Sequence, residues 1–178
     1  MMWGVFGRRR HKQPDAAGPR DLYDGLRNQI LDLDPSSAEL RPTTELPRVW
    51  GALLETGYER EVATLVSLSD GTTSLYTTSG FAIIGGGAHP QVVQATQRFL
   101  AAVESSLDDF DAEAEASLPA DAETIIRALT FEGRRSVRAP EEDFGYGRHP
   151  LSAVFHAGEA VIAELRRLHD AREDQRGG

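Results

Sequence analysis

Apolar residues recur at two different spacings along the chain, and the spacing predicts where helices and strands lie. Helical spacing, with apolar residues three or four apart, occurs in residues 21–33, 47–56, 90–110 and 151–168. Looser alternation with β-branched residues, typical of strands, occurs in residues 61–69, 72–78, 81–84, 124–131 and 134–139. The segment 81–84 reads either as a bulged extension of the strand before it or as a strand of its own.

Turn and capping residues support several of these boundaries. Asp70-Gly71 separates two predicted strands and is typical of a hairpin turn, because both residues adopt positive φ at low cost. Pro47 suits the first position of the short helix at 47–56, and Gly57 suits the position after its end. These signals predict a helix at 47–56 and a hairpin immediately after it.

The order of elements favours an α+β fold. We expect an antiparallel sheet of four to five strands with helices packed on one face. Residues 21–170 are expected to form one domain, between a disordered basic tail at 1–20 and a frayed tail at 171–178. Residues 108–123 are acidic and small, and they predict a flexible linker inside the domain.

A G-x-G-x-H-P signature occurs twice, at residues 85–90 and 145–150, each time before a predicted helix. An acidic-Gly turn lies upstream of each copy, and a glutamate, Glu61 or Glu123, lies ten residues before each turn glycine. The shared order raises the possibility of two duplicated β-β-α units. The apolar positions align poorly, however, since Leu65 would match Arg127.

The first signature contains the candidate ligand-binding residues Gly85, Gly86, Gly87 and His89. Glycines allow the backbone to approach a ligand closely, and the N–H groups of the following helix favour an anion. The Lys-Ser/Thr pair of a phosphate-binding P-loop is missing, so a simple bend into a Pro-started helix is the favoured reading. His89 is interpreted as a helix cap.

The second signature overlaps a run with two aromatic residues and an arginine, Phe144, Tyr146 and Arg148, which are candidates for partner binding. Aromatic residues and Arg are enriched in binding hot spots, whereas Phe144 equally suits the core. His149 is interpreted as a cap, like its counterpart. Bringing the two histidines together with Glu142 or Asp143 would create a metal site, but the spacing is generic and no metal is expected.

Composition narrows the function classes. The 178 residues carry a net charge of -9, which gives no electrostatic support for nucleic-acid binding. The chain has no cysteine, which excludes disulfides and thiolate chemistry and fits a cytoplasmic location. Its serines lack a nucleophile-elbow motif, and its carboxylates gather in the acidic run, so no catalytic residue and no cofactor are expected. Weak contact with a membrane surface is an alternative role for the tail residues Trp3, Phe6, Arg8, Arg9 and Arg10.

The run DGTTSLYTTSGFAIIGGGAHPQVV, within residues 48–103, resembles small uncharacterised bacterial proteins. The order of elements is similar to the roadblock/LC7 layout, which implies a dimeric adaptor that often regulates small GTPases in bacteria. A separate strand at 81–84 would depart from that layout and would look like the type III secretion chaperone layout, also a dimeric, acidic binding module. Neither resemblance implies any site residue.

The sequence therefore predicts a non-enzymatic protein-binding module: an adaptor, a chaperone-like protein or a regulatory partner. A protein partner or a second copy of the chain, forming a homodimer, is expected. One alternative is an anion or nucleotide binder that uses the Gly-rich loop before residue 90. A second alternative, suggested by charge, is an acidic immunity-type inhibitor of a basic enzyme.

Overall fold

The computed structural model describes residues 17–177. Its strands are β1 (Val49–Tyr58), β2 (Glu61–Leu68), β3 (Thr73–Thr77), β4 (Ala82–Ile83), β5 (Asp111–Ala112), β6 (Glu123–Thr130) and β7 (Gly133–Pro140). Its helices are α1 (Pro19–Leu31), α2 (Pro90–Ser105), α3 (Glu141–Gly145) and α4 (Ser152–Gly177), with short 3-10 turns η1 (Gly86–Ala88) and η2 (Leu107–Asp109).

The mixed α+β class and the antiparallel sheet are confirmed, but the sheet has seven strands instead of four to five. Its order is β4-β3-β2-β1-β6-β7-β5. The expected helix at 47–56 is wrong, because this segment forms β1 at the centre of the sheet. Every residue of β1 except Tyr58 is buried, and a strand buried on both faces reads as a nearly continuous apolar run that imitates helical spacing.

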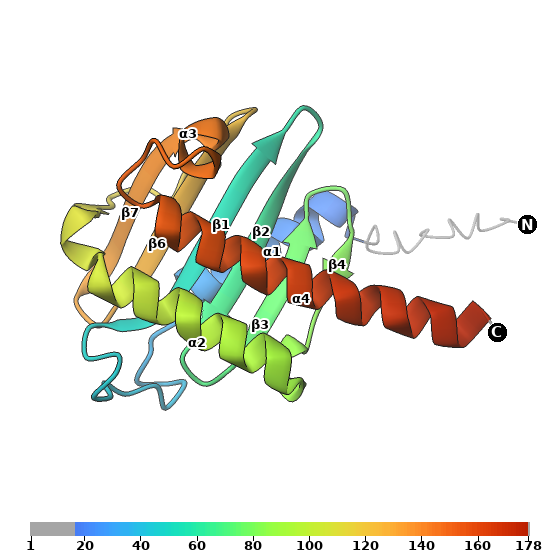
Figure 1. The fold of residues 1–178 in the computed structure, drawn as a ribbon, viewed down its shortest axis with the longest axis horizontal. Helices are drawn as coiled ribbons and strands as arrows, with labels where there is room; N and C mark the ends of the chain where they lie inside the picture. Colours follow the sequence, from blue (N-terminus) through green and yellow to red (C-terminus); the bar gives the residue numbers. More distant parts are fainter. Residues whose placement is uncertain (1–16, 178) are drawn as a thin grey trace, which may run out of the picture.

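Helices cover both faces of the sheet, which corrects the expectation of a single covered face. In Figure 1, α2 and α4 lie side by side in front of the sheet and α1 lies behind it. The larger core lies between the sheet and the α2–α4 pair, with Leu54 of β1 packed among residues such as Phe99 and Leu165. The smaller core lies under α1, where Tyr23 and Leu31 pack near Trp50 and Leu53.

The acidic run at 108–123 contributes to the domain more than a linker would. It contains β5, which pairs with β7, and Leu118 packs against the smaller core. Residue Asp121 forms a parallel bridge with Gly57 at the end of β1. The prediction of a flexible linker is therefore wrong for part of this run, which forms a short edge strand and a segment that packs beside α1.

The two hairpin–helix units are of opposite hand, which argues against a duplication. Strands β2 and β6 both pair antiparallel with β1, so they run in the same direction on either side of it. Their hairpin partners β3 and β7 lie on opposite outer sides, yet α2 and α4 cover the same face. No rotation superimposes two such units, whereas a tandem duplication gives units of one hand.

Two helix boundaries differ from the prediction. Helix α2 ends at Ser105, and the chain turns through η2 before Phe110, which is buried. Helix α4 continues to Gly177, so residues 171–177, which were expected to fray, are helical. The predicted membrane-contact residues Trp3, Phe6, Arg8, Arg9 and Arg10 lie outside the described residues. None of the helices within 17–177 has the length and apolar character needed to cross a membrane.

Candidate functional site

Backbone conformation at Gly85 and close packing at Gly86 and Gly87 account for the glycines of the first signature. Gly85 has φ of 83°, a conformation that favours glycine. A Cβ on Gly86 would lie 2.5 Å from Leu165 Cδ2, and a Cβ on Gly87 would lie 2.3 Å from the carbonyl oxygen of Gly71. The run therefore lets the loop before α2 pack tightly against α4 and the β2–β3 turn, as the favoured reading expects.

The two histidines of the repeated signature have different surroundings. His89 is the N-cap residue of α2 by backbone conformation, but its side chain makes no capping bond, and its Nε2 lies 2.9 Å from Arg172 Nη2. His149 Nδ1 accepts a hydrogen bond from the backbone N–H of Leu151, 3.0 Å away, and its ring packs on Phe144. Within the described chain, no group of three His, Cys, Asp or Glu side chains is placed to hold a metal ion.

The aromatic run before α4 is divided between core and surface. Phe144 belongs to α3 and is fully buried, stacked near Phe155, so its alternative role as a core residue is the one observed. Tyr146 is 76% exposed, and the guanidinium of Arg148 lies 5.1 Å from its ring centroid. Arg148 also pairs with Glu142 and Asp143, so three neighbouring side chains engage it on the surface.

These two candidate regions do not form one site. Phe144, Tyr146 and Arg148 precede the start of α4 at Ser152, whereas His89 contacts Arg172 near the far end of the same helix. Figure 1 shows α3 and the beginning of α2 at opposite sides of the molecule. Any ligand site built from both signatures is therefore excluded by the fold.

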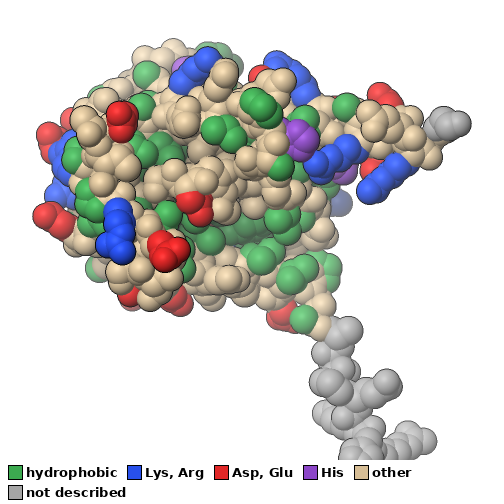
Figure 2. All heavy atoms as spheres, turned by 90° about the horizontal axis from the view of Figure 1, so that it is seen from below, with side chains coloured by type: hydrophobic (Ala, Val, Ile, Leu, Met, Phe, Trp, Pro, Cys, Tyr) green, Lys and Arg blue, Asp and Glu red, His purple; other side chains and the backbone are tan. Residues whose placement is uncertain are grey.

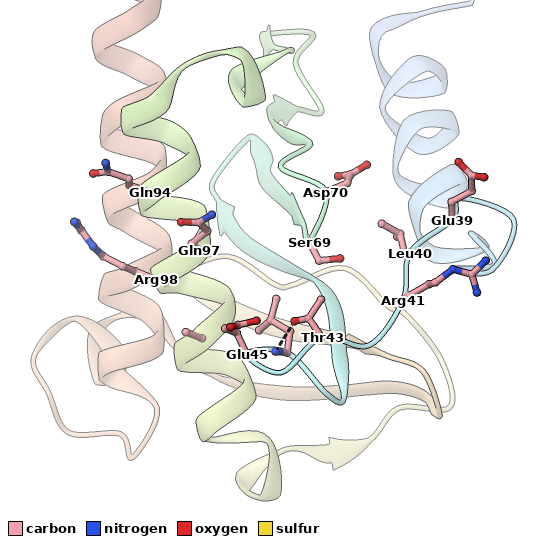
Figure 3. A pocket seen from close by; sticks show the side chains of 12 residues that line it. Glu39, Leu40, Arg41, Thr43, Glu45, Ser69, Asp70, Gln94, Gln97 and Arg98 are labelled. Atoms are coloured by element: carbon pink, nitrogen blue, oxygen red, sulfur yellow. Dashed lines mark hydrogen bonds between the residues drawn. The ribbon is translucent and has the colours of Figure 1, made fainter.

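A hollow in the described surface lies elsewhere, between α2 and the connector that precedes β1. We call it the α2 groove; it has a volume of about 890 Å³. Figure 3 shows its side chains arriving from three segments: the connector, the β2–β3 turn and the outer side of α2. Its lining residues are Glu39, Leu40, Arg41, Thr43, Glu45, Leu46, Ser69, Asp70, Gln94, Gln97, Arg98 and Ala101.

The groove continues into a second hollow of about 310 Å³ at the beginning of α2. The two hollows share Leu46, Ser69, Asp70 and Gln97. Gly87 lines this second part, and it is the only candidate residue from the sequence that reaches either hollow. Figure 2, which views the molecule from below, shows hydrophobic side chains between charged ones on that face.

The connector wall of the groove is shaped by local hydrogen bonds. The backbone N–H of Leu40 donates to the carbonyl oxygen of Pro35, 2.9 Å away, and Glu39 has φ of 59°, which is uncommon for a residue with a side chain. Further along, the N–H of Leu46 donates to Thr43 Oγ1 at 3.0 Å, the dashed line in Figure 3. The wall is therefore fixed by its own turns.

The rim of the groove carries charges of both signs. They are Glu39, Arg41, Glu45, Asp70 and Arg98. Within residues 17–177, none of these five side chains takes part in an ion pair. Below the rim, Leu40 is buried and Leu46 is half-buried. The groove thus combines an apolar floor with charges that are free to pair with a ligand.

A second cluster of charged groups lies beneath α1 and is closed to solvent. We call it the buried charge network: Arg27, Glu55, Glu113 and Arg127. Arg27 Nε lies 2.6 Å from Glu55 Oε1, Arg127 Nε lies 2.8 Å from Glu113 Oε1, and Arg127 also pairs with Glu55. The network joins α1 to the two central strands and to the acidic run.

Burial dominates the protonation equilibria of this cluster. Burial, together with the nearby positive charge of Arg27, lowers the pKa of Arg127 to about 9. Burial also raises the pKa of Glu113. A hydrogen bond from Ser136 and the positive charge of Arg134 lower this pKa, but burial outweighs them. The four side chains are at most 7% exposed, so a substrate would reach them only if α1 moved. Their arrangement suits fixing α1 on the sheet.

Sequence reasoning missed both the α2 groove and the buried charge network. One feature of the sequence indicated the network: the charged residues Glu55 and Arg127 lie within apolar segments that are expected to be buried. The groove had none, because its walls come from three segments that the fold alone brings together.

Comparisons with known proteins place this chain in no family. No known protein family matches it, and neither the curated proteins nor the solved structures contain a significant match. The similarity to the roadblock/LC7 and secretion-chaperone layouts therefore stays a prediction from the order of elements.

Proposed function

We propose that this protein is a non-enzymatic binding module whose α2 groove receives an extended segment of a partner protein. The observation that carries the proposal is the lining of the groove. An apolar floor is bordered by five charged side chains that are unpaired within the described residues. A peptide with apolar side chains and charges of both signs fits this lining, because it would bury the floor and neutralise the rim.

The shape of the groove favours a peptide over a small ligand. Small-molecule sites bury most of the ligand surface in a concave pocket with a few converging polar groups. The α2 groove is open, and together with the second hollow that it joins it extends from Gly87, before α2, to Glu39 in the connector. Its polar groups are distributed along the groove, which suits a peptide, because a peptide also carries polar and apolar groups along its length.

The alternative of an anion or nucleotide binder receives less support from the geometry. Close packing against Leu165 and Gly71 accounts for Gly86 and Gly87 without any ligand. The groove has two arginines. Arg41 belongs to the connector, and Arg98 lies about two helical turns beyond Pro90, away from the N–H groups that would hold an anion.

Selection of binding peptides from a random displayed library tests the proposal. Peptides that enrich on the protein should bind at least about tenfold more weakly to the variant Ala101→Arg, which places a long charged side chain in the groove. The matched control is Ala160→Arg, at an exposed position of α4 away from the groove. If the peptides bind both variants with the same affinity as the parent protein, the binding surface lies elsewhere and the proposal is overturned.

A further inference from the structure

Strand β4, two residues long, forms one edge of the described sheet. It pairs with β3 on one side, and no described strand pairs with its other side. Natural sheets usually protect such an edge with charges, proline or a covering segment. Residues 80–85 contain no charge and no proline, and Phe81 and Ile84 are 40% and 61% exposed. This edge is therefore suited to pairing with another strand.

Helix α4 passes over this edge and continues beyond it. The ring of His169 packs edge-on against Phe81, with 5.3 Å between the ring centroids. Leu165 is the last fully buried residue of the helix, and the side chains from Asp170 onward are exposed. Figure 1 shows the end of α4 projecting past the sheet. Packing usually supplies most of the stability of a helix, so this projecting end lacks its main source of stability in a single copy.

The charges of the projecting end are self-complementary about Asp170. Arg167 and Glu173 lie three residues before and after Asp170, and Arg166 and Asp174 lie four residues before and after it. One turn further out, Glu164 stands opposite Arg176. An antiparallel pair of these helices, centred on Asp170, would therefore bring Arg166 and Arg167 of one copy level with Glu173 and Asp174 of the other, at the cost of placing the two Asp170 side chains at the same level.

The edge strand and the helix require the same symmetry. A two-fold axis perpendicular to the sheet at the β4 edge makes two copies of β4 antiparallel and keeps both α4 helices on one face, also antiparallel. The contact of His169 with Phe81 places the centre of the charge pattern beside the edge strand. We propose that two copies of this chain form a homodimer in which β4 pairs with β4 and the projecting ends of α4 pair antiparallel.

The charges of α4 have a local alternative, since they also pair within one helix. Arg167 pairs with Glu164, and Arg176 Nη1 lies 3.7 Å from Glu173 Oε1. Such pairs on a solvated helix contribute little to stability. Ion pairs within one helix and ion pairs between two copies can be distinguished by charge-reversed variants. Only a dimer depends on the charges of the other chain.

The test uses two charge-reversed variants in sedimentation velocity experiments. The acidic variant carries Arg166→Glu and Arg167→Glu, and the basic variant carries Glu173→Arg and Asp174→Arg. The parent protein should be a dimer, and each variant alone should dissociate at least about tenfold more readily, because like charges then face each other. An equal mixture should restore the dimer as a heterodimer, since every acidic position meets a basic one.

Several outcomes would overturn the proposal. They are a monomeric parent protein, variants that dimerise as well as the parent, or a mixture that stays monomeric while circular dichroism shows both variants folded. If either variant loses its fold, a single chain with all four substitutions replaces the mixture, because its two copies match opposite charges again and should dimerise.

The edge strand is tested separately. Ile84→Lys places a charge at an exposed position directly after β4 and should weaken the dimer. Leu22→Lys is the matched control, because Leu22 is also an exposed apolar residue, 58% exposed, but lies on α1. Equal dimerisation of the two variants would show that the edge of β4 is not part of the interface.

Discussion

Glu104 illustrates how one side chain connects two elements of this fold. It lies near the end of α2 and is almost fully buried. Its carboxylate accepts hydrogen bonds from Arg48 Nε at 2.6 Å, from the backbone N–H of Arg48 at 3.0 Å and from that of Val49 at 2.8 Å. It therefore fixes the start of the central strand β1 against the helix that covers it.

The acid sensitivity of the fold should depend on Glu104. Burial alone would raise its pKa, but the hydrogen bonds from Arg48 and Val49 outweigh burial and lower the pKa below its usual 4.5. The resulting stabilisation is present above pH 4.5 and is lost as the pH falls through the lowered value. Glu104→Gln should cost about 1–3 kcal/mol at neutral pH. It should also flatten the fall of the unfolding free energy in acid, measured by urea unfolding from pH 7 downward; an unchanged slope would contradict this role.

Gly87 tests the packing interpretation of the glycine run. The substitution Gly87→Ala brings a Cβ to 2.3 Å from the backbone oxygen of Gly71, which cannot move aside as a side-chain end could. We expect a loss of about 1–3 kcal/mol in thermal or urea unfolding. The control Gly25→Ala, in the middle of α1 with open space around the new Cβ, should instead stabilise by about 0.5–1 kcal/mol. Equal effects of the two substitutions would refute the packing argument.

At the scale of elements, the buried charge network fixes α1 on the sheet. Arg127→Met would leave the carboxylates of Glu55 and Glu113 buried without their shared cation, and should destabilise the protein by about 3–5 kcal/mol. The control is Arg138→Met on the neighbouring strand. The Arg138 side chain is 42% exposed and pairs with Glu123, so its loss should cost about 0–1 kcal/mol. Similar unfolding free energies for the two variants would show that the network carries no stabilisation.

Most strands and helices were predictable, including the buried strand β6, but the central strand β1 was not. The hairpin β2–β3 and helices α2 and α4 were predicted from alternation, turn residues and apolar stripes that mark a single buried face. Strand β1 lost this signal, because apolar residues occupy both of its faces. Strand β5 has two residues inside an acidic run, too short to show any period.

The candidate site was less predictable than the fold for a different reason. The glycine and aromatic signatures are local, and most of their residues serve turns, caps and the core. The α2 groove depends on long-range placement, since Glu39, Asp70 and Arg98 come close only after the sheet and α2 pack together. A pattern confined to one segment contains no information about such a surface.

At the scale of the whole molecule, the two proposed binding surfaces are separate. The residues that line the α2 groove belong to the connector, the β2–β3 turn and α2, and none of them belongs to β4 or α4. A homodimer through β4 and α4 would therefore present two grooves, one on each copy. As proposed, the protein would bind a partner chain through the groove and a second copy of itself through the edge of the sheet.

Amide chemical-shift mapping of a selected peptide tests whether the α2 groove is the binding surface of this protein. The account predicts that the largest shifts on titration occur in residues 39–46, 69–71 and 94–101, which form the walls of the α2 groove. Shifts confined to α1 or to the residues around Tyr146, with the groove unaffected, would contradict it.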